Sequence, residues 1–127
     1  MNDQTPITGV MNIGIPVTDQ ARALEFYNQK LGFETRRDFP LQQFGARWIE
    51  VAPPGASIAL SLVPARDGVP AGVETGIRLA TEDAEATHAD LEANGVAVGE
   101  LLRWPGVPPM FGFRDADVNG LEIVEAT

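Results

Sequence analysis

The sequence of 127 residues contains no cysteine, and it has one histidine and one tyrosine. The absence of cysteine excludes disulfide bonds, thiolate zinc sites and cysteine nucleophiles. Basic residues are also scarce, since nine Lys and Arg stand against eighteen Asp and Glu, which gives a net charge of -9. A chain with this charge repels polyphosphates, so neither nucleic acid nor an anionic membrane is expected as a partner.

Long apolar runs are missing as well, and so is an N-terminal pattern of basic residues followed by apolar ones. No segment is long enough to span a bilayer, so we expect a cytoplasmic protein without a membrane partner. The hydrophobic fraction of 44% over 127 residues is sufficient for one domain with its own core.

An internal repeat divides the chain into two halves. The segment NIGIPVTDQARA in the first half aligns with GIRLATEDAEAT in the second. Both copies place an aspartate, Asp19 or Asp83, where a helix is predicted to begin, and a glycine, Gly32 or Gly95, where it is predicted to end. The repeat therefore predicts a duplicated module in which a strand runs into a helix.

After each predicted helix the hydrophobic residues alternate, which is typical of strands. The predicted strands are FETRRDFP, ARWIEVA and SIALSLVP in the first half, and VAVGELL, MFGFRD and LEIVEA in the second. We predict an α+β fold of two βαβββ modules, each a curved mixed sheet with its helix on the outer face. The single domain covers residues 1–127, with module one at about 8–64, a linker at 65–73 and module two at about 74–126.

Four segments together resemble a known superfamily. They are IPVTDQARALEFYNQKLGFE, RWIEVAPPG, GIRLATEDAEATHADLEANGV and FRDADVNGLEIVE, and they are similar to the vicinal oxygen chelate (VOC) superfamily. This superfamily includes glyoxalase I, the bleomycin-resistance proteins, extradiol dioxygenases and fosfomycin-resistance transferases, so the likeness is specific for fold but not for activity. The resemblance implies sheets that enclose a cavity and, in catalytic members, one metal ligand on the first and last strand of each module.

By this resemblance the ligand positions fall on Asn12, Ala59, Gly76 and Glu122. Only Glu122 is a strong ligand, because alanine and glycine have no donor atom and an asparagine amide is a weak neutral ligand. We therefore expect no cofactor, and a divalent metal is disfavoured. Two interpretations of Asn12 stay open: it faces the cavity in which relatives hold metal, or it satisfies nearby backbone groups.

Glu122 also has two interpretations. On an inward strand face it could act as a general base. Alternatively it pairs with Arg78, which lies two residues after Gly76 on the same strand face, because the first and last strands of a module are neighbours in the resembled fold. We favour the ion pair, since buried charges are usually compensated.

Both tryptophans are candidates for the cavity wall. Trp48 is out of phase with Ile49 and Val51, which should face the helix, so Trp48 and Glu50 are predicted to point to the cavity side. Trp104 opens the proline-rich loop RWPGVPPMF, which is suited to cover a pocket. Aromatic walls with an arginine nearby fit flat or amphipathic ligands. The predicted ligand-binding residues are Asn12, Trp48, Arg78, Trp104 and Glu122.

Two further signals are interpreted as structural. The segment DADVNG at 115–120 copies the start of a calcium loop, but the twelfth position is Ala126 rather than glutamate, so we predict a turn between the last two strands. His88 falls in the middle of the second predicted helix, between Glu85 and Glu92, and we expect a surface residue rather than a catalytic one.

Two functions of different classes follow. The first is a metal-free binding protein of the bleomycin-resistance type that holds a small aromatic or polar molecule. The second is an enzyme: a glyoxalase-like lyase or isomerase or a dioxygenase, dependent on metal or using Glu122 as a base. The missing ligands favour binding. We also expect a homodimer, because curled sheets leave open edges that members of the resembled superfamily usually close against a second module or subunit.

Overall fold

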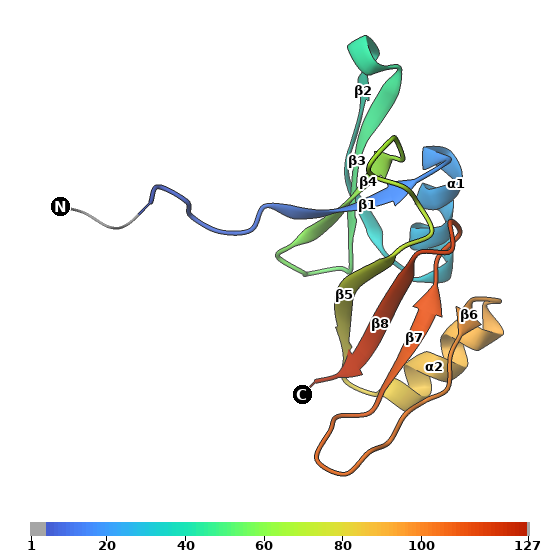
Figure 1. Cartoon of the computed structure of the whole chain (residues 1–127). Helices are drawn as coiled ribbons and strands as arrows, with labels where there is room; N and C mark the ends of the chain where they lie inside the picture. The colour runs from blue at the N-terminus through green and yellow to red at the C-terminus, as the bar shows by residue number, and fades with distance from the viewer. Residues whose placement is uncertain (1–4, 127) are drawn as a thin grey trace.

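The computed structural model describes residues 5–126, in which two βαβββ modules each form one four-stranded sheet (Figure 1). Module one consists of β1 (Asn12–Val17), α1 (Gln20–Glu25), the π-helical turn η1 (Phe26–Lys30), β2 (Glu34–Leu41), the 3-10 turn η2 (Gln42–Phe44), β3 (Ala46–Ala52) and β4 (Ala59–Pro64). Module two consists of β5 (Glu74–Thr81), α2 (Ala84–Ala93), β6 (Ala97–Val98), β7 (Met110–Arg114) and β8 (Gly120–Glu125). The duplicated α+β fold predicted from the sequence is thus confirmed.

In each module the first strand lies beside the last. Sheet one has the order β1-β4-β3-β2 and sheet two the order β5-β8-β7-β6. The β1–β4 and β5–β8 pairs are parallel, and the remaining pairs are antiparallel. Asn12 lies opposite Ala59, and Arg78 lies opposite Glu122. Because residues directly opposite each other share a face, the candidate positions of each module come together on one side of its sheet.

Both helical segments lie between the predicted aspartate and the predicted glycine, although the first changes from α1 to the π-helical turn η1 at Phe26. Asp19 caps α1 by accepting a hydrogen bond from the Arg22 backbone N–H at 3.1 Å, and Asp83 caps α2 in the same way. Gly32 and Gly95 follow the helical segments with φ angles of 75° and 84°. A residue with a side chain is strained in this left-handed conformation, so the glycines give the helical segments a defined end.

One hydrophobic core joins the two modules on the helical side of the sheets. Ile15, Ile49 and Leu62 of sheet one belong to the same buried cluster as Phe111 and Ile123 of sheet two. In Figure 1 both helices lie to the right of the sheets, while the segment before β1 extends to the left. We call the sheet surfaces turned away from the helices the open faces. Within residues 5–126, no helix has the length and hydropathy needed to cross a bilayer.

The strand predicted over 96–102 is wrong in its length. Only Ala97–Val98 forms β6, and one further hydrogen bond connects the Gly99 N–H to the Gly112 carbonyl at 2.7 Å. Pairing returns only as an isolated bridge between Leu102 and Met110. Between these two points, Glu100 and Leu101 lie opposite the single residue Phe111, and this extra residue interrupts the ladder as a β-bulge does.

The predicted turn between the last two strands is confirmed, but it is buried and joins the two modules. Asn119, which is fully buried, donates its amide N–H groups to the Pro16 carbonyl at 2.8 Å and to Asp115. Its amide oxygen accepts from the backbone N–H groups of Gly72 and Val73 in the linker. One side chain therefore connects β1, the linker and the turn.

The two aspartates of this turn accept hydrogen bonds from the first helical segment: one from the residue before its cap and one from its buried tyrosine. Asp115 accepts a hydrogen bond from the Tyr27 hydroxyl at 2.8 Å, and Asp117 accepts from the Thr18 backbone N–H at 2.9 Å. Burial, together with the charge and hydrogen bond of Asp115, raises the pKa of Tyr27. Val118 at the tip of the turn adopts a φ of 64°, which is a strained conformation for a β-branched residue.

Candidate functional site

The open face of sheet one carries an aromatic pair. Trp48 on β3 lies opposite Phe39 on β2, and the two rings are stacked with centroids 6.3 Å apart and an interplanar angle of 14°. Ile49 and Val51 point to the other side of β3 and are fully buried in the core. The alternation predicted for this strand is therefore confirmed, and Trp48 lies on the face away from the helix.

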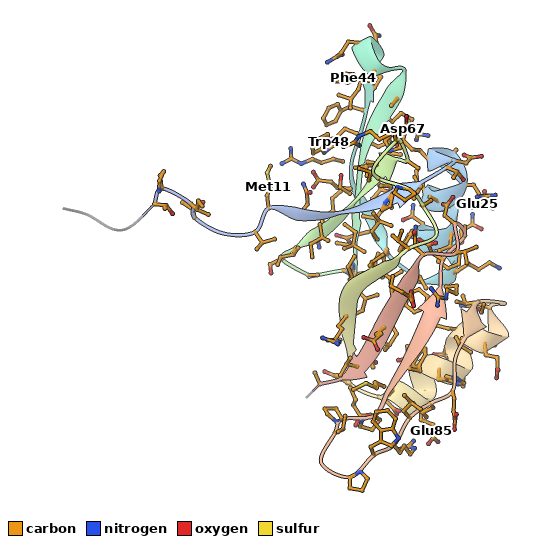
Figure 2. All side chains as sticks on the ribbon, in the orientation of Figure 1. Met11, Glu25, Phe44, Trp48, Asp67 and Glu85 are labelled. Atoms are coloured by element: carbon orange, nitrogen blue, oxygen red, sulfur yellow. The ribbon has the colours of Figure 1, made fainter. Side chains whose placement is uncertain are left out.

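A mainly apolar cavity of about 470 Å³ lies against this part of the sheet. Its wall includes Leu41, Phe44, Trp48 and Val63, and Arg66 also lines it. Phe44 and Trp48 lie on the same side of the β2–β3 hairpin (Figure 2). A cavity with aromatic and aliphatic walls and an arginine nearby fits a small molecule with a flat apolar body.

Glu50 is a buried carboxylate on the same open face, and its side chain is 9% exposed. The Trp48 indole Nε1 donates a hydrogen bond of 2.7 Å to Glu50 Oε2, and Asn12 Nδ2 lies 3.5 Å from the same oxygen. The other oxygen, Oε1, lies 3.9 Å from Arg37 Nε, which is too long for a hydrogen bond. Asn12 thus points along the open face toward Glu50, and its part in ligand binding stays a prediction.

The open face of sheet two carries two ion pairs. Arg78 Nε donates to Glu122 Oε1 at 3.0 Å, so the predicted pair forms. The two side chains are 69% and 44% exposed, which places the pair at the surface of the chain rather than in a buried site. Arg114 makes two hydrogen bonds to the Glu74 carboxylate, and this second pair lies directly over Gly120.

A cavity of about 560 Å³ lies on this second open face. Its lining includes four glycines, Gly76, Gly99, Gly112 and Gly120. Glycines leave the backbone of the sheet uncovered, so polar main-chain groups contribute to the surface of the cavity. Because Glu122 and Arg114 also line it, this cavity is more polar than the one on sheet one.

The four positions that the resemblance assigns to metal ligands do not form a metal site. Asn12 lies opposite Ala59, which has no donor atom, and the carboxylate of Glu122 is held by Arg78. Gly76 has no side chain at all. In the part of the chain that the structure describes, residues 5–126, no three His, Cys, Asp or Glu side chains gather as a metal site requires. The donor set does not fit a catalytic zinc or nickel ion.

Two other residues singled out in the sequence do not line either cavity. Trp104 is 57% exposed in the loop between β6 and β7 and lines neither cavity, so its role in ligand binding stays a prediction. His88 packs edge-on against Phe111 with ring centroids 4.8 Å apart, and its Nε2 hydrogen-bonds to the Gly99 carbonyl. The histidine therefore connects α2 to sheet two and is less exposed than expected.

The sequence reasoning did not single out Phe39 and Phe44 as site residues. It placed Glu50 on the correct face without assigning it a role. The pairing of Phe39 with Trp48 depends on the register of the hairpin, and that register follows from the short turn at Gln42–Phe44. Two hydrophobic strands joined by a few residues around Gly45 are the available signal for such a hairpin.

Comparisons with known proteins agree with this geometry. The family described as Glyoxalase/Bleomycin resistance protein/Dioxygenase superfamily matches residues 9–123. TnmS3, an antibiotic binding protein from Streptomyces sp. CB03234, is 32% identical, with a TM-score of 0.86 over 98% of this chain and 100% of that chain. A superfamily member from Sphaerobacter thermophilus DSM 20745 is 34% identical, with a TM-score of 0.87 over 94% of this chain and 98% of that chain. The uncharacterized protein YetH of Bacillus subtilis (strain 168) is 32% identical over 117 residues, 89% of this chain and 94% of that protein.

Proposed function

Because the chain belongs to the glyoxalase/bleomycin resistance protein/dioxygenase superfamily, we propose that it binds a small aromatic molecule on the open face of sheet one, without a metal ion. The observation that carries this proposal is the mainly apolar cavity of about 470 Å³ with Phe44 and Trp48 in its wall. The similar structure TnmS3 is an antibiotic binding protein, which supports binding of a small molecule.

The aromatic wall is held in position before a ligand arrives. Trp48 is stacked on Phe39, and its indole nitrogen is bonded to Glu50. A side chain already fixed in this way loses little freedom on binding, so more of the contact energy appears as affinity. Each well-placed aromatic contact contributes about 1 kcal/mol beyond the burial of apolar area.

An enzymatic function has less support from the same residues. A metal-dependent lyase, isomerase or dioxygenase needs a set of ligands, and Asn12, Ala59 and Gly76 do not supply it. For Glu122 to act as a base, its carboxylate would first have to leave the 3.0 Å contact with Arg78. The contacts of this chain therefore favour binding over catalysis.

We expect planar aromatic compounds to raise the thermal stability of the protein and to quench its tryptophan fluorescence. The Trp48→Leu substitution should weaken the affinity of such a compound about tenfold or more, because it removes the ring that faces the cavity. Titrations in the presence of a metal chelator should give the same affinity as titrations without it.

A parallel Trp104→Leu variant tests the second predicted tryptophan in the same titration. Trp48→Leu with native affinity for a confirmed ligand would contradict the assignment of the site to sheet one. An affinity that a chelator abolishes and zinc restores would instead favour a metal-dependent function.

We also expect a homodimer. Among residues 5–126, the first strand of each module is an edge strand of its sheet, and Phe39 on sheet one and Phe44 in the turn η2 are exposed to solvent. Unpaired edges and exposed aromatic rings are stabilised when a second copy covers them. Light scattering on the purified protein at micromolar concentration should give twice the mass of the chain, and the mass of a monomer would exclude this arrangement.

A further inference from the structure

We propose that Glu50 selects the ligand: its carboxylate accepts a hydrogen bond from an O–H or N–H group on the edge of a planar molecule. This inference rests on the proposed function and names the ligand class for it, namely phenols and aromatic amines rather than ethers or carboxylates of the same ring system. Glu50 does not itself line the cavity but lies next to two residues that do: Trp48 precedes it by two residues on β3, and Ser61 lies opposite on β4.

The first observation is that only one of the two carboxylate oxygens of Glu50 accepts hydrogen bonds. A carboxylate has about four acceptor positions, and a buried one normally receives several hydrogen bonds. At Glu50 both donors, Trp48 Nε1 and Asn12 Nδ2, approach Oε2. Among residues 5–126, no group donates a hydrogen bond to Oε1, and Arg37 Nε stays 3.9 Å away. One oxygen is therefore held in place and the other remains able to accept.

The second observation is a contrast on the same hairpin. Arg47 binds the Asp38 carboxylate with two hydrogen bonds, of 3.1 Å and 2.6 Å. Arg37 does not bind Glu50 in this way, and its side chain is 58% exposed. A bidentate arginine would use both oxygens of the carboxylate, as it does at Asp38. The arginine beside Glu50 instead donates no hydrogen bond to Oε1, and its positive charge lies nearby.

The third observation is that acceptor and aromatic ring form one unit. The Trp48 indole is fixed by Glu50 through its nitrogen and by Phe39 through its face. A flat ligand that stacks against this group brings the edge of its own ring toward the carboxylate. A donor on that edge gains a charge-assisted hydrogen bond, an ether oxygen gains none, and a ligand carboxylate meets a like charge.

Three probes with the same ring system test the selectivity: 2-naphthol, 2-methoxynaphthalene and 2-naphthoate. In the native protein we expect 2-naphthol to bind about tenfold more tightly than 2-methoxynaphthalene, and 2-naphthoate to bind more weakly than either, measured by quenching of tryptophan fluorescence. In Glu50→Gln, which keeps the shape of the side chain, the preference for 2-naphthol over 2-methoxynaphthalene should fall to about threefold or less.

The control is Glu34→Gln, the same substitution on β2, where the carboxylate is exposed and bonded to Arg36. This variant should keep the native preference.

Equal affinity for 2-naphthol and 2-methoxynaphthalene in the native protein would overturn the role of Glu50 while leaving the proposed function intact. An unchanged preference in Glu50→Gln would do the same. If Glu50→Gln does not fold, the comparison of probes in the native protein decides alone. Absence of quenching by all three probes would overturn the proposed function and this inference together.

Discussion

Replacing Asn119 by alanine is expected to lower the free energy of unfolding by about 3 kcal/mol. Asn119 is fully buried and makes four hydrogen bonds, to Gly72, Val73, Pro16 and Asp115. The substitution leaves the buried Pro16 carbonyl and Asp115 carboxylate without the amide, and it also removes the acceptor of the less buried N–H groups of Gly72 and Val73. Each buried group that loses its partner costs about 1 kcal/mol or more.

Urea unfolding, followed by tryptophan fluorescence, measures this loss. The matched control is Asn94→Ala, since Asn94 is exposed and its side chain makes one hydrogen bond, to the Lys30 carbonyl. We expect the control to lose about 1 kcal/mol or less. Equal losses in the two variants would show that the buried hydrogen bonds of Asn119 contribute no more to stability than the exposed one of Asn94.

A large loss of folding stability is expected at alkaline pH. The pKa of Tyr27 is raised above its ordinary value of 10.0, mainly by burial and further by the charge and hydrogen bond of Asp115. In the unfolded chain this tyrosine ionises near pH 10, whereas in the folded protein it keeps its proton. Above this pH the unfolded state therefore binds fewer protons, and stability falls by about 1.4 kcal/mol per pH unit. Below pH 10, the stabilising contribution of the protonated Tyr27 is fully present.

The chain has a single tyrosine, so the near-ultraviolet absorbance of tyrosinate reports on Tyr27 alone. The absorbance should rise only as the protein unfolds. The variant Tyr27→Phe should lose about 1 kcal/mol at neutral pH, because Asp115 loses a donor, but it should lack the additional alkaline slope. Formation of tyrosinate near pH 10 in the folded protein would contradict the burial and bonding of this hydroxyl.

The parts of the fold that could be predicted are those that depend on local patterns. Asp19 and Asp83 cap helices because their side chains reach backbone N–H groups three residues ahead, and such short distances are visible in the sequence. The faces of β3 followed from simple alternation around Trp48. The strand expected over 96–102 was too long, because alternation alone does not show that an extra residue opposite Phe111 interrupts the pairing.

The contacts that sequence reasoning missed connect residues far apart in the chain. Tyr27 and Asp115 are 88 residues apart, and they meet only because module two packs against the first helical segment. Glu50 and Asn12 come together across the intervening strand β4. Neither contact has a local signature, since the residues involved are ordinary at their own positions. Such sites become visible only when the packing of the modules is known.

Gly120 has a consequence for the charges on the open face of sheet two. The Glu74–Arg114 pair occupies the space that a Cβ atom at position 120 would take. Both charged side chains are flexible, so a larger residue there would displace the pair without disturbing the strand itself. A side chain at position 120 would therefore separate the acid from the arginine and leave both groups able to make new contacts. An uncharged residue thus controls the arrangement of charge on the open face of sheet two.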